Sequence, residues 1–223
     1  MTIDSHTHVE SPLAHQFDDL EQQRAAADLG MWLFLATELM FFAGLFLTYF
    51  LYRLNDEAAF AAASHHLDVV WGTVNTAVLL TSSLTVAISV HAAQSRDQRK
   101  LTQLLAATIG LGTLFVAIKG WEYHGKYQHG LMPLMGLPFR WDVDSTRPGA
   151  ELFYDLYYVM TGVHLLHMVI GLGLMLVLLV KAMRGGLLGE FATPVRMIGL
   201  YWHFVDVIWV FLFPLLYLIG AHP

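Results

Sequence analysis

Five long apolar blocks constrain this chain more than any other feature of its sequence. Each block is long enough to cross a hydrocarbon core of about 30 Å as a helix of about 20 residues. Only helices and closed barrels satisfy their own backbone hydrogen bonds in lipid, and blocks of this length favour helices. The sequence therefore predicts an all-α fold, a polytopic membrane bundle of five transmembrane helices. The predicted spans are residues 29–52, 69–93, 101–123, 152–180 and 197–220, in a membrane domain at 29–223 that follows a polar N-terminal tail at 1–28.

The composition supports a membrane protein and excludes several chemistries. Hydrophobic residues make up 56% of the chain and charged residues 13%, whereas a typical soluble domain has about 25% charged residues. The formal charge of −6 gives no reason to expect a nucleic-acid partner. The chain has no cysteine, which excludes disulfides, thiolate zinc or copper sites, iron–sulfur clusters and covalently attached haem.

The Lys and Arg residues beside the spans predict how the chain crosses the membrane, because cytoplasmic segments carry an excess of these residues. With the N-terminus in the cytoplasm and the C-terminus outside, seven of them lie on the inner side and four on the outer side. The inner set is Arg24, Arg96, Arg99, Lys100, Lys181, Arg184 and Arg196, and the outer set is Arg53, Lys126, Arg140 and Arg147. This distribution favours a cytoplasmic N-terminus.

Glycine and proline mark the places where the helices are interrupted or approached closely. The connection at residues 125–151 is rich in both and in aromatic residues, which predicts an ordered cover lying on the membrane surface. Gly171 and Gly173 are expected to let a neighbouring helix approach the fourth span. Pro214 lacks a backbone donor inside the fifth block, so we expect packing by a neighbouring helix to compensate.

Glu38 lies in the middle of the first span, in the run LATELMFF at residues 35–42. A carboxylate there costs at least about 2.5 kcal/mol, so it needs a partner, a proton or a polar cavity. Two interpretations are open: a proton-handling group, or a protonated acid whose hydrogen bonds join helices. We favour the second interpretation, and we predict His203 as the partner.

Two further spans carry polar residues at helical spacing. His164 and His167 are three residues apart in the fourth span, and His203 and Asp206 are three apart in the fifth. These residues and Glu38 allow two interpretations, a haem or dimetal site or an interhelical hydrogen-bond network. A dimetal bundle requires Glu-x-x-His pairs that this chain lacks, and the histidines lie at different depths, so the sequence favours the network.

Lys119 and Glu122 form another pair three residues apart, near the predicted outer end of the third span. Residues at this spacing share a helix face, so we predict a structural ion pair at the outer membrane boundary.

Four stretches, in this order, resemble subunit III of the haem–copper respiratory oxidases in its short five-helix bacterial form. They are LATELMFF at 35–42, NTAVLLTSS at 75–83, TGVHLLHMVIG at 161–171 and YWHFVDVIW at 201–209. The last two stretches together are specific, and the resemblance extends over residues 29–220. In that family Glu38 matches a carbodiimide-reactive glutamate that is buried among polar groups.

The resemblance implies a non-catalytic subunit III of a cytochrome c oxidase, a proton-pumping, multi-subunit terminal oxidase of aerobic respiration and the electron transport chain. Such a subunit holds no catalytic, cofactor or metal site of its own, and haem and copper are expected in partner subunits. It packs directly on subunit I, assembles with subunit II and other subunits, binds structural phospholipid, and supports proton uptake and stability during turnover. The implied location is the bacterial cytoplasmic membrane, and Glu38, His164, His167, His203 and Asp206 are the implied buried network.

Alternatives to this interpretation share its fold or belong to other classes. Quinol oxidases and nitric-oxide-reductase accessory proteins use similar five-helix subunits. An independent haem-binding protein or transporter is a more distant alternative, although inverted repeats and broken helices typical of transporters are not evident. Seven-helix members of the family have two additional N-terminal helices that help to form a lipid-filled cleft. Here a polar tail stands before the first span, so completion of that cleft would need another subunit.

Overall fold

The computed structural model describes residues 13–133, 139–142, 144–185 and 187–218. Within these residues the secondary structure is helical, with no strand. The long helices are α1 (Leu20–Asn55), α3 (Val69–Gln94), α4 (Gln98–Gln128), α5 (Arg147–Met183) and α6 (Thr193–Phe213). Shorter elements are α2 (Glu57–His65), the 3₁₀ turns η2 (Asp144–Thr146) and η3 (Gly189–Ala192), and the π-helical turn η4 (Pro214–Leu218) that continues α6.

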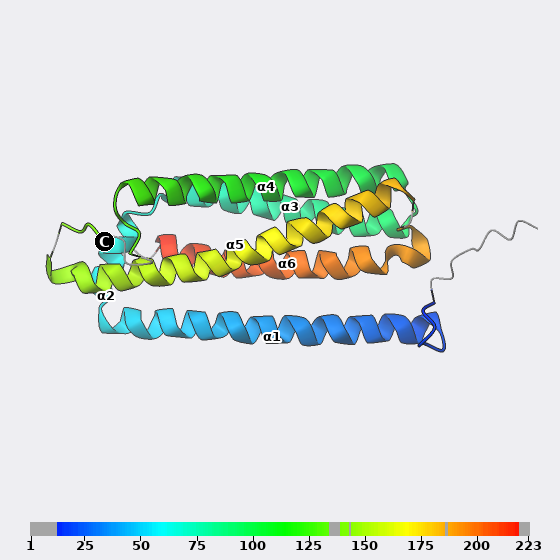
Figure 1. Ribbon diagram of the computed structural model, residues 1–223, viewed down its shortest axis with the longest axis horizontal. Coiled ribbons are helices and arrows are strands. Elements are labelled where there is room, and N and C mark those ends of the chain that lie inside the picture. Colours follow the sequence, from blue (N-terminus) through cyan, green and yellow to red (C-terminus); the bar gives the residue numbers. More distant parts are fainter. Residues whose placement is uncertain (1–12, 134–138, 143, 186, 219–223) are drawn as a thin grey trace, which may run out of the picture.

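Five helices in the described part of the chain are long and apolar enough to cross a membrane, which confirms the prediction of a helical bundle with five spans. The helices run alternately in opposite directions along one axis (Figure 1). Helices α1 and α5 contain 36 and 37 residues, and at 1.5 Å per residue they are each about 55 Å long. Both therefore extend well beyond a hydrocarbon core of about 30 Å.

Helix α1 begins earlier than the apolar block does. Asp19 caps it, with its Oδ1 accepting from the amide of Gln22 at 2.7 Å. An acceptor at this position satisfies one of the free amides at a helix start. Residues 20–28, assigned from the sequence to the polar tail, are therefore the first turns of α1. Residues 1–12 of that tail lie outside the described residues.

The connections contain structure that the sequence reading did not predict. Helix α2 lies between the first two spans, where Asp56 caps it by accepting from the amide of Ala59 at 3.1 Å. Its buried Phe60 packs edge-on against Phe153 of α5, with ring centroids 5.6 Å apart. A Cβ at Gly149 would come within 2.5 Å of the Ala59 Cβ, so α2 and α5 are in close contact there.

The predicted connection at 125–151 is shorter in the structure, because α4 continues to Gln128 and α5 begins at Arg147. In its described part, Trp141 donates to Oγ1 of Thr146 at 3.0 Å, and Arg147 donates to the carbonyl of Phe139 at 3.1 Å. Phe139 and Trp141 also pack against Tyr154 of α5. This segment therefore lies over the end of α5; residues 134–138 and 143 are outside the described residues.

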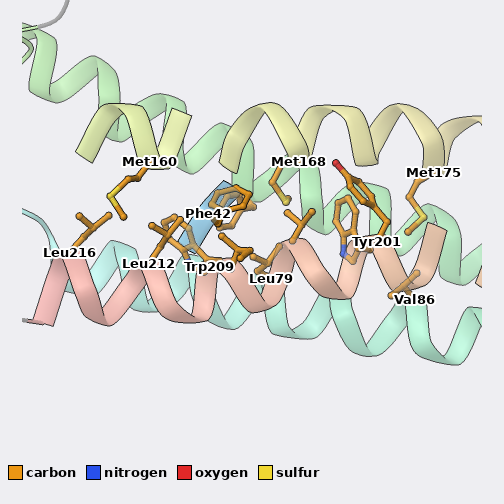
Figure 2. Packing of buried hydrophobic residues seen from close by; sticks show 14 of the residues in the cluster. Phe42, Leu79, Val86, Met160, Met168, Met175, Tyr201, Trp209, Leu212 and Leu216 are labelled. Carbon is orange, nitrogen blue, oxygen red and sulfur yellow. The ribbon is translucent and has the colours of Figure 1, made fainter. Parts of the chain in front are cut away.

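The core lies where α6 packs against α3 and α5. Figure 2 shows Met160, Met168 and Met175 of α5 facing α6 and α3. Two buried indoles of α6 also donate to hydroxyls of α3, Trp202 to Ser82 at 3.0 Å and Trp209 to Thr76 at 2.9 Å. Buried indole N–H groups require an acceptor, so these bonds set the register of α6 on α3.

Glycines allow the indole of Trp202 to fit between helices. A Cβ at Gly112 of α4 would lie 2.7 Å from this ring, and a Cβ at Gly171 of α5 would lie 2.9 Å from it. The prediction of a close helix approach is therefore confirmed at Gly171. It is wrong at Gly173, where no described atom lies within 4 Å of an added Cβ.

Candidate functional site: polar groups buried in the bundle

Glu38 pairs with a histidine, but the predicted partner, His203, is wrong. Oε2 of Glu38 in α1 lies 3.0 Å from Nε2 of His167 in α5. The side chains are 23% and 13% exposed, so the pair lies at the edge of the bundle, between α1 and α5. The hydroxyl of Tyr201 in α6 donates to the backbone carbonyl of His167 at 3.0 Å, which adds a third helix to the contact.

The hydrogen bond made by the second ring nitrogen of His167 determines where the protons of this pair can lie. Its Nδ1 lies 2.8 Å from the carbonyl oxygen of Val163, which can only accept, so Nδ1 carries a proton. If the ring is neutral, Nε2 accepts and Glu38 must be protonated and donate. If the ring is charged, Nε2 donates to a carboxylate. In both states one proton lies between Glu38 and His167.

His203 has a different partner. Its Nδ1 lies 2.6 Å from Oγ of Ser83, so it joins α6 to α3 and not to α1. Asp206, one turn further along α6, is 3% exposed and lies beside the same serine. Neither of its carboxyl oxygens has a hydrogen-bond partner among the described residues. An isolated buried carboxylate is costly, and the described residues around this position offer it no evident compensation.

His164 is fully buried and packs between aromatic rings. Its ring centroid lies 5.6 Å from that of Phe115 in α4 and 5.2 Å from that of Trp209 in α6. Both of its ring nitrogens lack a partner among the described residues. The five residues predicted as one network therefore occupy three separate places: the Glu38–His167 pair, the Ser83–His203–Asp206 group, and the aromatic site of His164.

Lys119 and Glu122 belong to a larger polar assembly that sequence reasoning did not find. Nζ of Lys119 donates to Oε2 of Glu122 at 2.9 Å and to the hydroxyls of Tyr157 and Tyr217 at 3.1 and 2.7 Å. Both tyrosines also donate to Glu122, Tyr157 at 2.8 Å and Tyr217 at 2.7 Å. We call these four residues the Glu122 cluster; it joins α4, α5 and η4.

Aromatic rings surround the cation of the Glu122 cluster. Nζ of Lys119 lies between 5.1 and 5.5 Å from the ring centroids of Tyr123, Tyr157, Trp209 and Tyr217. A desolvated cation at this distance from a ring is stabilised by about 2 kcal/mol or more. Because Tyr157 and Tyr217 come from other helices, the i,i+3 spacing of Lys119 and Glu122 identified only the part of the cluster on α4. The placement of the Glu122 cluster at the outer membrane boundary stays a prediction.

The described residues bring no three His, Asp or Glu side chains together in a group that could hold a metal ion. The histidines differ in environment: His167 is bonded to Glu38, His203 to Ser83, and His164 is enclosed by rings. The polar groups that are hydrogen-bonded in this arrangement join helices. Each bonded set connects two or three helices of the bundle.

Known proteins match the parts of the chain that carry these groups. The family model for cytochrome c oxidase subunit III matches residues 15–128 and 148–221. The chain belongs to this family. Cytochrome c oxidase subunit 3 of Corynebacterium diphtheriae is 33% identical over 193 residues, which cover 86% of this chain and 87% of the relative. Cytochrome c oxidase subunit 3 of Bacillus subtilis is 32% identical, over 86% of each chain.

A relative from another branch covers even more of the chain. Cytochrome bo(3) ubiquinol oxidase subunit 3 of Pseudomonas aeruginosa is 27% identical over 94% of this chain and 92% of its own. Family membership confirms the resemblance found in the four sequence stretches. The chain is thus a multi-pass membrane protein and a subunit III of the haem–copper oxidases, a family of multi-subunit, proton-pumping complexes.

Proposed function

We propose that this chain is the accessory third subunit of an oxidase that reduces O₂ to water with electrons from cytochrome c. It packs directly on subunit I, in a bacterial cytoplasmic membrane, with its N-terminus in the cytoplasm. It carries no redox centre; the haem and copper belong to partner subunits. The observation that carries the proposal is the use of the buried polar groups to join helices, above all the Glu38–His167 pair. Polar groups used in this way support a structural role for the subunit and not a catalytic one.

The exposure of α1 supports a role in binding lipid and partner subunits. Large apolar side chains such as Trp32, Met40 and Leu47 are 64%, 77% and 58% exposed along this helix. In a membrane these surfaces contact acyl chains or the helices of another subunit. Through these contacts the subunit holds structural phospholipid, supports proton uptake into subunit I and prolongs activity during turnover.

Cytochrome c is proposed as the electron donor because the more similar relatives carry that name. Those from C. diphtheriae and B. subtilis are 33% and 32% identical, against 27% for the ubiquinol oxidase subunit of P. aeruginosa. A quinol-oxidising complex is the second candidate, and the extent of the P. aeruginosa match supports it. Assays of the purified complex with reduced cytochrome c and with a quinol distinguish the two donors.

The proposal is tested by purifying the tagged chain from its native membranes in a mild detergent. Mass spectrometry identifies the partner chains, and a reduced-minus-oxidised spectrum reports haem. The same spectrum is then recorded on the chain after it has been separated from its partners. Large membrane subunits and a haem signal in the complex, with none in the separated chain, are the expected result. Haem that stays with the separated chain contradicts the proposal, as does a chain that purifies without partners.

A further inference from the structure

A groove on the outer surface of α3 and α4 has one polar end and a long apolar wall. It has a volume of about 980 Å³, at the upper end of the ~300–1,000 Å³ range of small-molecule pockets. Its walls belong to α3 and α4, which lie on the opposite side of the bundle from α1 (Figure 1), and neither Glu38 nor His167 lines it. We call it the α3–α4 groove.

The polar end of the groove holds a buried cation with too few acceptors. Lys126 lines the groove and is only 7% exposed. Its Nζ donates to the carbonyl of His66 at 3.3 Å and lies 3.9 Å from Glu122, whose carboxylate is already bonded by Lys119 at 2.9 Å. An ammonium group has three donors, and among the described residues this one has a single hydrogen bond. The geometry therefore leaves donors for an anionic group in the groove.

An acidic side chain shares this rim. Asp68 lines the groove and caps α3, and its Oδ1 accepts from the amides of Val70 and Trp71 at 3.0 and 3.1 Å. Its Oδ2 has no hydrogen-bond partner among the described residues, which leaves an acceptor for a cationic group. The rim thus presents a donor at Lys126 and an acceptor at Asp68, and a ligand that carries both signs of charge complements it.

The wall of the groove has the depth profile of a lipid site. Trp71 and Trp121 are 50% and 78% exposed beside the polar end, and exposed tryptophans gather at the membrane–water interface. Beyond them the wall is apolar and extends to Val78 and Leu114. Leu114 and Lys126 are twelve positions apart on α4, so the wall is about 18 Å long at 1.5 Å per residue. This length suits an acyl chain whose headgroup lies at the rim.

We propose that the α3–α4 groove binds a zwitterionic glycerophospholipid with a primary amine, a phosphatidylethanolamine. Its phosphate accepts from Lys126, its ammonium group donates to Asp68, and one acyl chain lies along the wall between α3 and α4. A phosphatidylglycerol offers Lys126 the same phosphate but gives Asp68 no cation. The inference rests on the lipid-binding role proposed above and assigns that role to a particular site.

The test uses the intact oxidase complex. Four variants are compared with the wild type: Ala117→Phe, which fills the wall; Lys126→Gln; Asp68→Asn, which keeps a capping oxygen; and Ala107→Phe. The last is the control, because Ala107 is exposed on α4 and does not line the groove. Each complex is stripped with detergent and titrated with palmitoyl-oleoyl phosphatidylethanolamine or phosphatidylglycerol, and bound lipid is counted by native mass spectrometry.

After titration, the wild type and Ala107→Phe are expected to bind one phosphatidylethanolamine more than Ala117→Phe does. Loss of a charge-assisted hydrogen bond should weaken binding about tenfold in Lys126→Gln, and Asp68→Asn should remove the preference over phosphatidylglycerol. An unchanged lipid count in both Ala117→Phe and Lys126→Gln overturns the proposal, and so does a wild type without headgroup preference. Loss of a protein chain in Ala117→Phe, with lipid retained, means that the groove contacts another subunit. Haem content is recorded for every complex. A complex without haem contradicts the proposed function, whereas the lipid count alone decides whether the groove binds phosphatidylethanolamine, so the two proposals fail separately.

Discussion

Oε2 of Glu38 lies 3.0 Å from Nε2 of His167, and along α1 this pair lies between two other polar contacts of the helix, one with α6 and one with η4. Near the start of the helix, Asp28 pairs with Arg196 of α6 at 2.8 Å. Near its end, the hydroxyl of Tyr49 donates to the carbonyl of Leu215 at 2.9 Å. Much of the apolar surface of α1 is exposed, so these contacts and the buried Leu35, Phe42 and Tyr49 together hold the helix against α5 and α6.

Replacing Glu38 with Gln should leave haem content and initial turnover nearly intact. The side-chain amide of the Glu38→Gln variant can donate to Nε2 of His167, so the contact between α1 and α5 survives without the titratable proton. Glu38→Leu leaves Nε2 without a partner and should destabilise the complex by about 1–3 kcal/mol. The measurements are the haem-to-protein ratio, initial O₂ consumption and the temperature of half-inactivation. A large loss of initial activity in Glu38→Gln would show that the acid handles protons needed for the reaction.

Lys119→Met should destabilise the subunit strongly. It removes the cation that Glu122, Tyr157 and Tyr217 surround, and breaking a buried ion pair on one side costs about 3–5 kcal/mol. We expect the variant subunit to dissociate from the complex at a lower temperature than the wild type does. Native gel electrophoresis of heated samples measures this temperature. The control is Lys100→Met. Lys100 pairs with Asp97 at 3.1 Å, but its side chain is 71% exposed, so losing this surface ion pair should change the dissociation temperature little.

The double variant Lys119→Met with Glu122→Gln separates charge from shape in the Glu122 cluster. A neutral amide can still accept from Tyr157 and Tyr217, so no unpaired charge remains among the four residues of the Glu122 cluster. Lys126, which lies 3.9 Å from Glu122, keeps its hydrogen bond to the carbonyl of His66. We expect this variant to recover much of the stability lost in Lys119→Met. If the double variant is no more stable than Lys119→Met, packing of the lysine, and not its charge, is what the site requires.

Spacing along one helix allowed some of the site to be predicted from the sequence, and contacts between helices account for most of the rest. Lys119 and Glu122 are three residues apart, so their shared face follows from helix geometry. Tyr157 and Tyr217 reach the same carboxylate from α5 and η4, at sequence separations of 35 and 95. The same limit explains the error at Glu38, because the depth and rotation that favour His167 over His203 depend on how α1 packs.

The five spans were predictable because block length alone decides them, whereas the ends of helices and the short α2 were not. Residues 20–28 are polar and give no hydropathy signal, yet the Asp19 cap starts α1 before them. The run EAAFAAASH at 57–65 is too short to span a membrane, and its burial depends on contact with α5. Hydropathy therefore identifies what crosses the bilayer, and local capping and tertiary contacts determine the rest.

Gly112→Ala should destabilise the bundle, whereas Gly110→Ala should not. A Cβ at Gly112 would lie 2.7 Å from the indole of Trp202 and 2.9 Å from Leu172. The indole is fully buried and bonded to Ser82, so it has little room to shift, and the expected cost is about 1–3 kcal/mol. Gly110, on the same helix, has no described atom within 4 Å of an added Cβ, so Gly110→Ala should be neutral or stabilising. Equal thermal stability of the two variants would contradict the close approach at Trp202.

Tyr49→Phe tests how the end of α6 is held after Pro214. The last carbonyls of a helix lack intrahelical partners, and here Tyr49 and Ser64 donate to the carbonyls of Leu215 and Leu216 at 2.9 and 2.7 Å. Removing the buried hydroxyl of Tyr49 should cost about 0.5–1.5 kcal/mol and increase amide hydrogen exchange at residues 215–218. Tyr52→Phe on the same helix is the control, because Tyr52 is 46% exposed and should change neither quantity. Hydrogen exchange that stays unchanged in Tyr49→Phe would mean that packing alone holds this end of α6.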